Sequence, residues 1–178
     1  AAPGIVLGLL GRNQSRLDEV AERCRARGAA RVVTGAIDVD ERARLAAWMR
    51  DFDAAQTIDL LIANAGVFTG HGAAGDMETA DEIAWMLRTN LEGVVNSIGG
   101  ALPMMRARQR GRIAIVSSLA ALQPLADAPG YSASKTGVMG YGEALREYLI
   151  ADNVGVSLIF PGHIETAQVT GHVGALPL

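Results

Sequence analysis

The sequence is short of several features, and each shortage excludes a class of protein. It contains one cysteine, Cys24, which cannot form an internal disulfide or build a metal site by itself. No apolar run approaches the roughly 18 residues of a membrane-spanning helix, and no secretion signal opens the chain. A net charge of −3 gives no reason to expect nucleic acid. With 178 residues and 49% hydrophobic content, we expect a single soluble domain over 1–178 in the cytoplasm.

Lysine is as scarce as cysteine, because Lys135 is the only lysine among sixteen basic residues. It ends a run that begins at Tyr131 and reads YSASK. Residues four apart lie on one face of a helix, so the Lys135 ammonium can sit beside the Tyr131 phenol. A positive charge there favours phenolate over phenol and so helps the side chain to exchange a proton near neutral pH. The pair is a candidate catalytic site, although a Tyr and a Lys at this spacing also occur by chance.

Apolar runs alternate along the chain with amphipathic runs, a pattern typical of parallel βαβ construction. The apolar runs predict strands at 5–10, 31–37, 58–63, 113–117 and 154–160. The amphipathic runs predict helices at 15–26, 41–52, 80–89, 91–108 and 131–151, with Ser15 as the N-cap of the first. No repeat or linker interrupts this order, so we predict no second domain.

A serine at the end of the fourth predicted strand strengthens the catalytic hypothesis. Ser118 stands thirteen residues before Tyr131, where its hydroxyl can bond the substrate oxygen that the phenol protonates. With this serine, the sequence resembles the short-chain dehydrogenase/reductase family, whose motif YxxxK and upstream serine match Tyr131, Lys135 and Ser118. The neighbouring Ser117 is the alternative, but the family spacing selects Ser118. The resemblance implies a doubly wound parallel α/β sheet of the Rossmann type.

The resemblance also indicates that part of the family domain is absent from this sequence. The family has a Gly-rich, phosphate-binding turn after a first strand, whereas residues 1–4 look like the end of the helix that follows it. In the strand order 3-2-1-4-5-6 the missing strand is central, so we expect a hole in the sheet and a chain that is a fragment. Gly70, Gly72 and Gly75 spell GxGxxG, but they follow no strand directly and run into acidic residues, so we predict a loop there.

Several residues after the predicted strands match the cofactor site of the family. Gly11 stands where a carboxylate would select NAD, and Arg12 follows it, which favours the 2′-phosphate of NADP. A solvated turn arginine is the alternative. The resemblance assigns cofactor contacts to Tyr131 and Lys135 and to a further set: Arg12, Asp38, Val39, Asn64, Ala65, Gly66, Pro161, Gly162, Ile164 and Thr166.

Asn90 matches the asparagine that completes the catalytic tetrad of the family. By the resemblance it breaks its helix locally and holds a water that connects Lys135 to solvent. An asparagine that caps the helix at 91–108 is the other interpretation, and both can hold together.

The sequence therefore predicts an oxidoreductase that transfers a hydride between NADP(H) and a carbonyl or secondary alcohol, with Tyr131 as general acid and base. NAD is the less favoured cofactor, and no metal is expected. Substrate identity is not predicted, beyond a fairly apolar set of loop residues: Val67, Phe68, Leu119, Leu122, Gln123 and Leu125. The alternative is a non-catalytic binding or scaffold protein that lacks the phosphate-binding turn, which residues upstream of Ala1 would decide.

The helices at 91–108 and 131–151 have more apolar residues than one core-facing stripe requires. Their second faces predict a two-fold contact, and the resemblance implies a homodimer or homotetramer through the same helices. Met105 and Leu145 are taken as positions on this interface.

Overall fold

The computed structural model describes residues 4–69, 77–162 and 164 as two parallel sheets with helices packed on them. The first sheet has two strands, β1 (Val6–Gly11) and β2 (Arg31–Ala36). The second has three strands in the order β3 (Leu60–Ala63), β4 (Gly111–Val116) and β5 (Val154–Ile159). Every pairing is parallel, so the predicted α/β fold with βαβ connections is confirmed.

The first half of the chain alternates strand and helix as predicted. Helix α1 (Gln14–Ala26) connects β1 to β2, and α2 (Arg42–Ala55) follows β2. The predicted N-cap Ser15 is wrong by two residues, because the Asn13 side chain accepts the Arg16 backbone N–H at 3.0 Å. Asparagine and serine are both good caps, so a run with both leaves the start of the helix ambiguous.

The second half contains one long helical path between β3 and β4. It consists of α3 (Ala80–Met86), a π-helical turn (Leu87–Glu92) and α4 (Gly93–Ala107). A reciprocal capping box of Thr79 and Glu82 begins α3. The last helix, α5 (Pro129–Tyr148), begins two residues earlier than predicted, with proline in its first turn, where a missing N–H costs nothing.

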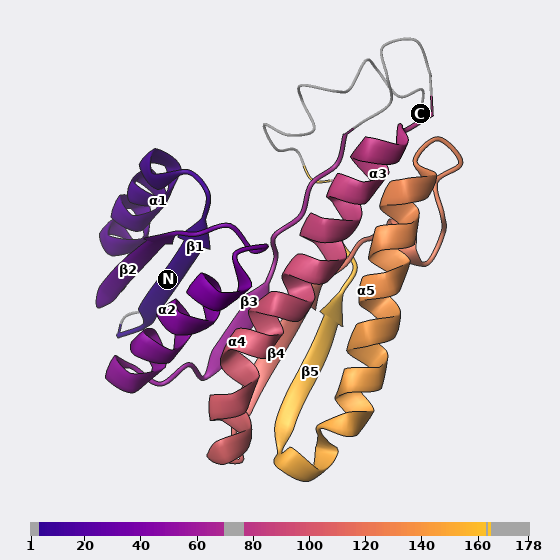
Figure 1. Cartoon of the computed structure of the whole chain (residues 1–178). Helices are drawn as coiled ribbons and strands as arrows, with labels where there is room; N and C mark the ends of the chain where they lie inside the picture. Colours follow the sequence, from indigo (N-terminus) through magenta and orange to yellow (C-terminus); the bar gives the residue numbers. More distant parts are fainter. Residues whose placement is uncertain (1–3, 70–76, 163, 165–178) are drawn as a thin grey trace.

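Helices α2, α4 and α5 lie side by side on one face of the strands, and α1 lies on the opposite face of β1 and β2 (Figure 1). The largest fully buried side chains include Leu45 of α2, Ile98 of α4 and Ile115 of β4. Arg108, just after α4, donates two hydrogen bonds of 2.9 and 3.0 Å to the Asp53 carboxylate of α2. This core and this ion pair join the half with β1 and β2 to the half with β3, β4 and β5.

Strands β1 and β3 are not hydrogen-bonded to each other, and Figure 1 shows the two sheets separated at this point. Alternate residues of β3 also differ in exposure. Leu61 and Ala63 belong to the core, whereas Leu60 and Ile62 are 53% and 58% exposed on the other face. The sheet thus has the interruption that the sequence predicts, with apolar side chains open to solvent beside it.

Candidate active site

The site is built around the first two turns of α5, which present Tyr131 and Lys135 on the same side. The Lys135 ammonium nitrogen lies 5.8 Å from the centroid of the Tyr131 ring and donates a 3.3 Å hydrogen bond to the Val116 carbonyl at the end of β4. Lys135 is 4% exposed, while Tyr131 is half-buried. The structure therefore brings the predicted pair together at the carboxyl edge of the second sheet.

Burial lowers the pKa of Lys135 from 10.5 to about 8, because removal from water disfavours the charged ammonium. At neutral pH the side chain still holds its proton. A compact cation therefore lies close to the Tyr131 ring in surroundings of reduced polarity, where charges interact more strongly than in water.

The two adjacent serines after β4 have different surroundings. The Ser117 hydroxyl is buried and donates a 2.9 Å hydrogen bond to the Lys135 carbonyl, so it fixes α5 against the end of β4. Ser118 is more exposed, and its hydroxyl oxygen accepts the Ala120 backbone N–H at 3.2 Å. Within the described part of the chain that hydroxyl donates no hydrogen bond, which leaves its proton for a ligand. The geometry thus favours the serine that the family spacing selects.

Asn90 is completely buried inside the π-helical turn and does not cap a helix. Its side chain accepts the Val67 N–H at 2.7 Å and donates to the Val67 carbonyl at 2.9 Å. It also donates to the Ser134 hydroxyl at 3.0 Å, which in turn donates to the Tyr131 carbonyl at 2.7 Å. The capping interpretation is therefore wrong: the asparagine ties the loop after β3 to the helix with the tyrosine.

The segment after β3, from Asn64 to Gly66, passes close to the side chains of Lys135 and Asn90. A Cβ atom at Gly66 would lie 3.3 Å from the Lys135 ammonium nitrogen and 3.5 Å from the Asn90 amide oxygen. The first is tighter than an ordinary contact, so glycine allows the backbone to approach Lys135 directly. Beyond it, the ring of Phe68 meets that of Tyr131 edge to face, with centroids 4.9 Å apart.

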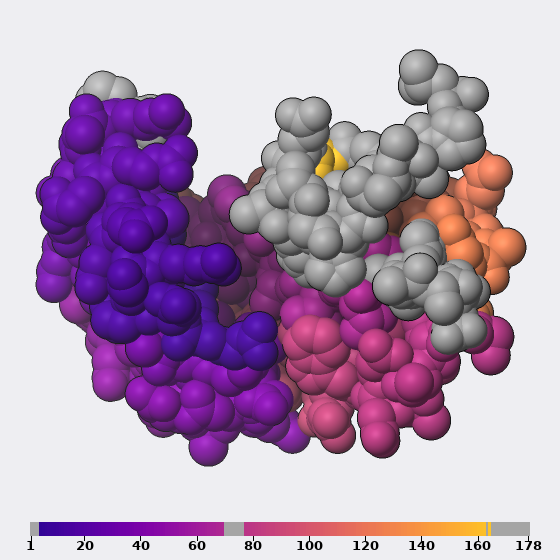
Figure 2. Space-filling model, turned by 90° about the horizontal axis from the view of Figure 1, so that it is seen from above, coloured from indigo at the N-terminus to yellow at the C-terminus, as the bar shows by residue number. Residues whose placement is uncertain are grey.

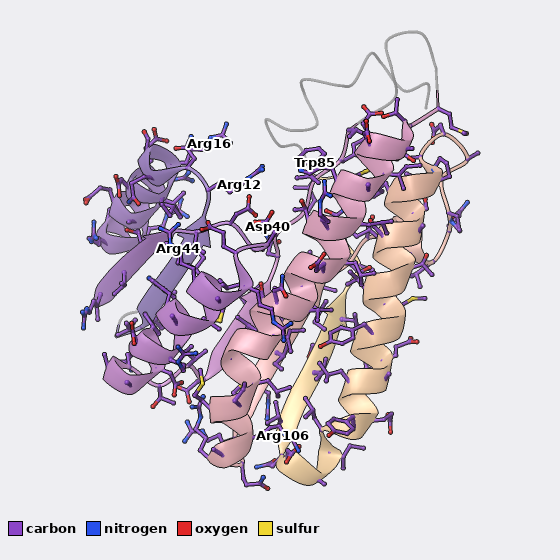
Figure 3. The ribbon with its side chains drawn as sticks, viewed as in Figure 1. Arg12, Arg16, Asp40, Arg44, Trp85 and Arg106 are labelled. Atoms are coloured by element: carbon purple, nitrogen blue, oxygen red, sulfur yellow. The ribbon has the colours of Figure 1, made fainter. Side chains whose placement is uncertain are left out.

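The predicted adenosine end lies on the other sheet. Arg12 follows β1 and projects toward the space between the two halves (Figure 3). Its guanidinium pairs with the Asp38 carboxylate at 3.6 Å, and both groups are accessible to solvent. Val39 packs against α4, since a Cβ at Gly93 would overlap its side chain, and its carbonyl accepts an Asn96 hydrogen bond at 3.0 Å. The structure thus brings together two residues that the sequence assigned to separate contacts.

The run after β5 approaches the serine loop. The Pro161 carbonyl accepts the Leu119 backbone N–H at 3.1 Å, and Gly162 lies next to the Leu119 side chain. Ile164 is 57% exposed. Thr166 and the GxGxxG glycines, Gly70, Gly72 and Gly75, lie outside the described residues.

Viewed onto the carboxyl ends of the strands, the surface is hollowed between the indigo half with β1 and the magenta residues that follow β3 (Figure 2). In open α/β sheets this edge is where ligands bind. Residues 4–69, 77–162 and 164 contain no cluster of three or more potential metal ligands. None of the helices in that described part combines the length and hydrophobicity that a membrane crossing needs.

Sequence reasoning missed one residue of this region, Glu78. Its carboxylate is buried and accepts hydrogen bonds from the first turn of α5. The only signal in the sequence is an acidic residue just before the Thr79 capping box, which gives no indication of a partner 52 residues away.

These features define a doubly wound α/β protein with a tyrosine and lysine pair at the ligand-binding edge. The chain belongs to the short-chain dehydrogenases, whose family profile matches residues 1–173. It is 35% identical over 173 residues to a 3-dehydrosphinganine reductase of Arabidopsis thaliana, covering 92% of this chain and 49% of that protein. It is 38% identical over 109 residues to a 3-ketodihydrosphingosine reductase of Bacteroides thetaiotaomicron, covering 61% and 40%. The chain thus spans about half the length of the curated relatives it matches.

Solved structures agree on the fold. A metagenomic short-chain oxidoreductase in complex with NADP superposes with a TM-score of 0.76 at 30% identity, covering 90% of this chain and 71% of that one. A 3-oxoacyl-[acyl-carrier protein] reductase from Brucella melitensis superposes with a TM-score of 0.84 at 27% identity, covering 95% and 64%. Both are oxidoreductases by name, and one of them contains a nicotinamide dinucleotide.

Proposed function

We propose that the protein containing this chain is an oxidoreductase that transfers a hydride between NADP(H) and a carbonyl or secondary alcohol. The observation that carries the proposal is the position of the Lys135 ammonium 5.8 Å from the Tyr131 ring, with the hydroxyl of Ser118 at the same edge of the sheet. Family membership supports it, because the relatives named above are reductases.

The nicotinamide group supplies the hydride, and the residues of this chain supply position and a proton. Tyr131 donates a proton to the carbonyl oxygen in reduction and accepts one in oxidation. Ser118 orients that oxygen with its hydroxyl. Lys135 holds its ammonium group beside the phenol and bonds the ribose, and Asn90 anchors the path by which Lys135 exchanges a proton with solvent.

The proposed cofactor is NADP, with NAD as the alternative. Arg12 follows β1 at the place where the family holds the adenosine ribose, and Gly11 offers no carboxylate to repel a phosphate. Arg12 pairs with Asp38 in this structure. Because this ion pair is exposed to solvent, the guanidinium can leave it and shift toward a bound phosphate. Asp38, Val39, Asn64, Ala65, Gly66, Pro161, Gly162, Ile164 and Thr166 are the proposed contacts along the remaining cofactor.

For the substrate we propose a ketone carried on an aliphatic chain. Leu119, Leu122 and Leu125 follow Ser118 and are 50%, 58% and 39% exposed, an unusual concentration of large apolar side chains in water. The names of the sphinganine relatives point the same way. Reduction by NADPH of 3-keto compounds of increasing chain length tests this: we expect kcat/KM to rise with length, and equal values for short and long chains would contradict it.

The test of the function itself is Tyr131→Phe in the full-length protein. The variant keeps the ring that meets Phe68 but removes the proton donor. We expect turnover to fall by about 10²- to 10⁴-fold, the usual contribution of a general acid, while NADPH binding measured by fluorescence stays within twofold. Unchanged turnover would refute the assignment. Tyr141→Phe is the matched control, because Tyr141 lies on the same helix about three turns after Tyr131. This variant should retain full activity.

We further propose a homodimer or homotetramer in the cytoplasm, assembled through the outer faces of α4 and α5. Gly99 and Gly140 lie on these faces, and a Cβ at either would meet nothing within 4 Å. Val95 on α4 is 38% exposed. Small residues on an open helix surface allow a second pair of helices to approach closely.

A further inference from the structure

Tyr131 is held by its backbone from two directions. Its carbonyl accepts the Ser134 hydroxyl at 2.7 Å, and Ser134 is bonded to Asn90. Its N–H donates to the Glu78 carboxylate at 3.1 Å, and the N–H of Gly130 donates to the other oxygen of the same carboxylate. The first set leads through Ser134 to Asn90, the asparagine of the proposed tetrad. The second comes from a residue to which the sequence assigned no role.

Glu78 caps the start of α5, because the N-cap residue of that helix has no side chain that could do so. The first N–H groups of any helix have no partner within the helix, and Ala128, at the N-cap of α5, makes no side-chain cap hydrogen bond. A carboxylate at this end also interacts favourably with the helix dipole. Glu78 is 6% exposed, and a buried carboxylate is tolerated where it is hydrogen-bonded, as the two N–H groups ensure here.

The surroundings fix the position of this carboxylate closely. A Cβ atom at Gly130 would lie 2.7 Å from a Glu78 oxygen and 2.5 Å from Cγ1 of Ile83, so only glycine lets α5 approach this near. On the other side, Glu78 directly precedes Thr79, whose capping box with Glu82 holds the start of α3. The Glu78 side chain is therefore attached just before the start of α3, and its carboxylate bonds the start of α5.

We propose that Glu78 is a positioning residue for Tyr131: it holds the first turn of α5 so that the phenol stays beside the Lys135 ammonium and within reach of the substrate oxygen. The proposal rests on the function proposed above, in which Tyr131 transfers the proton. Misplacement of a reacting group by about 1 Å can cost about 10²-fold in rate, so a clamp on the backbone of that group affects turnover directly.

Glu78→Asp in the full-length protein tests the proposal, because it keeps the charge and withdraws the carboxylate by one methylene. We expect kcat to fall by about 10- to 100-fold while the dissociation constant of NADPH stays within twofold, since the cofactor contacts lie elsewhere. Glu19→Asp is the matched control, because this exposed glutamate lies on α1, away from Glu78 and α5. We expect it to change kcat less than twofold.

A double-variant cycle with Gly130→Ala separates positioning from general damage. The new methyl group displaces the Glu78 carboxylate, so the two changes remove the same interaction, and the double variant should be no slower than the slower single one. Multiplying effects would overturn the proposal. So would a parallel loss of kcat, NADPH affinity and thermal stability in Glu78→Asp, which would show a merely structural role.

Two outcomes keep this test separate from that of the function. If Tyr131→Phe is inactive and Glu78→Asp is fully active, the inference about Glu78 fails and the proposed function stands. If Tyr131→Phe is fully active, the function fails whatever Glu78 does. Should Glu78→Asp not fold, Glu78→Gln keeps an acceptor oxygen at full length, and its kcat should lie between those of the wild type and of Gly130→Ala; a value equal to the wild type would contradict the clamp.

Discussion

At the scale of single residues, burial separates the groups that hold the site from those that face its ligand. Asn90 and Ser134 are completely buried and bonded to the backbone, and Ser117 is 3% exposed. Tyr131 and Ser118 are more accessible. We therefore propose that the half-buried Tyr131 and Ser118 face the substrate, while Asn90, Ser134 and Ser117 hold the surrounding backbone in position.

Lys135 gives a prediction for stability. Its pKa is 10.5 in the unfolded chain and about 8 in the folded protein. Between these values the unfolded state holds a proton that the folded state has lost, so the free energy of unfolding rises with pH. The rise from pH 8 to 10.5 should approach about 3 kcal/mol, at about 1.4 kcal/mol per unit. Urea unfolding of the cofactor-free full-length protein at several pH values measures it.

Lys135→Met provides the reference for that measurement, because methionine fills a similar volume without a charge. We expect the variant to be more stable than the wild type at pH 7 and to lose this advantage by pH 10.5. A constant difference across the range would show that Lys135 is not the group responsible.

Arg12 gives a prediction for cofactor choice. If its guanidinium binds the 2′-phosphate, Arg12→Ala should raise the KM for NADPH about tenfold or more, since a charge-assisted bond of about 1.5–3 kcal/mol is lost. NADH has no such phosphate, so its KM should change less than twofold. Arg27→Ala, an exposed arginine just past the other end of α1, is the control and should alter neither. Equal loss for both cofactors would show that Arg12 only holds Asp38.

At the scale of helices and strands, the periodicity of apolar residues predicted each described strand and α-helix, within a few residues at its ends. It could not show that the helical path through Asn90 continues from α3 into α4 by a π-helical turn. A π-helical turn inserts a residue into the helix without interrupting the apolar stripe. The side chain of Asn90 is buried because partners at Val67 and Ser134, far away in the sequence, satisfy it.

The two predicted interface positions, Met105 and Leu145, were wrong for a related reason. Met105 is completely buried and Leu145 is 8% exposed, so both belong to the core under α4 and α5. Both helices are rich in apolar residues, and composition alone does not tell which stripe faces the sheet. Charges at Met105 or Leu145 would therefore unfold the protein rather than dissociate it.

Gly140→Glu tests the proposed assembly with the corrected positions. The new side chain meets nothing within the subunit, and glutamate forms helix better than glycine, so the folded subunit should be at least as stable. In a two-fold contact the added charges would be buried close to the partner, and light scattering at micromolar concentration should show smaller particles. Ala26→Glu on α1 is the control. An unchanged mass in Gly140→Glu would refute an interface through α5.

At the scale of the whole molecule, the strand order of the family predicted both the interruption and its place. Strands β1 and β3 end up unpaired with each other because no strand of the described residues lies between them. What the sequence could not predict is that the halves would still pack, through α2 against α4 and the Arg108 pair with Asp53. We propose that in the full-length protein a further strand fills this place and that its connection covers the open face of β3.

Ile62→Asp tests that arrangement. The side chain is 58% exposed on the open face of β3, so in a chain limited to residues 1–178 the aspartate should change stability by less than about 0.5 kcal/mol. In the full-length protein the same carboxylate would be buried against the covering segment without a partner, and we expect a loss of more than about 2 kcal/mol. Ile150→Asp, at a site 68% exposed after α5, should be mild in both forms. Equal effects of Ile62→Asp in the two lengths, measured by urea unfolding, would show that nothing covers this face and that the interruption persists in the complete protein.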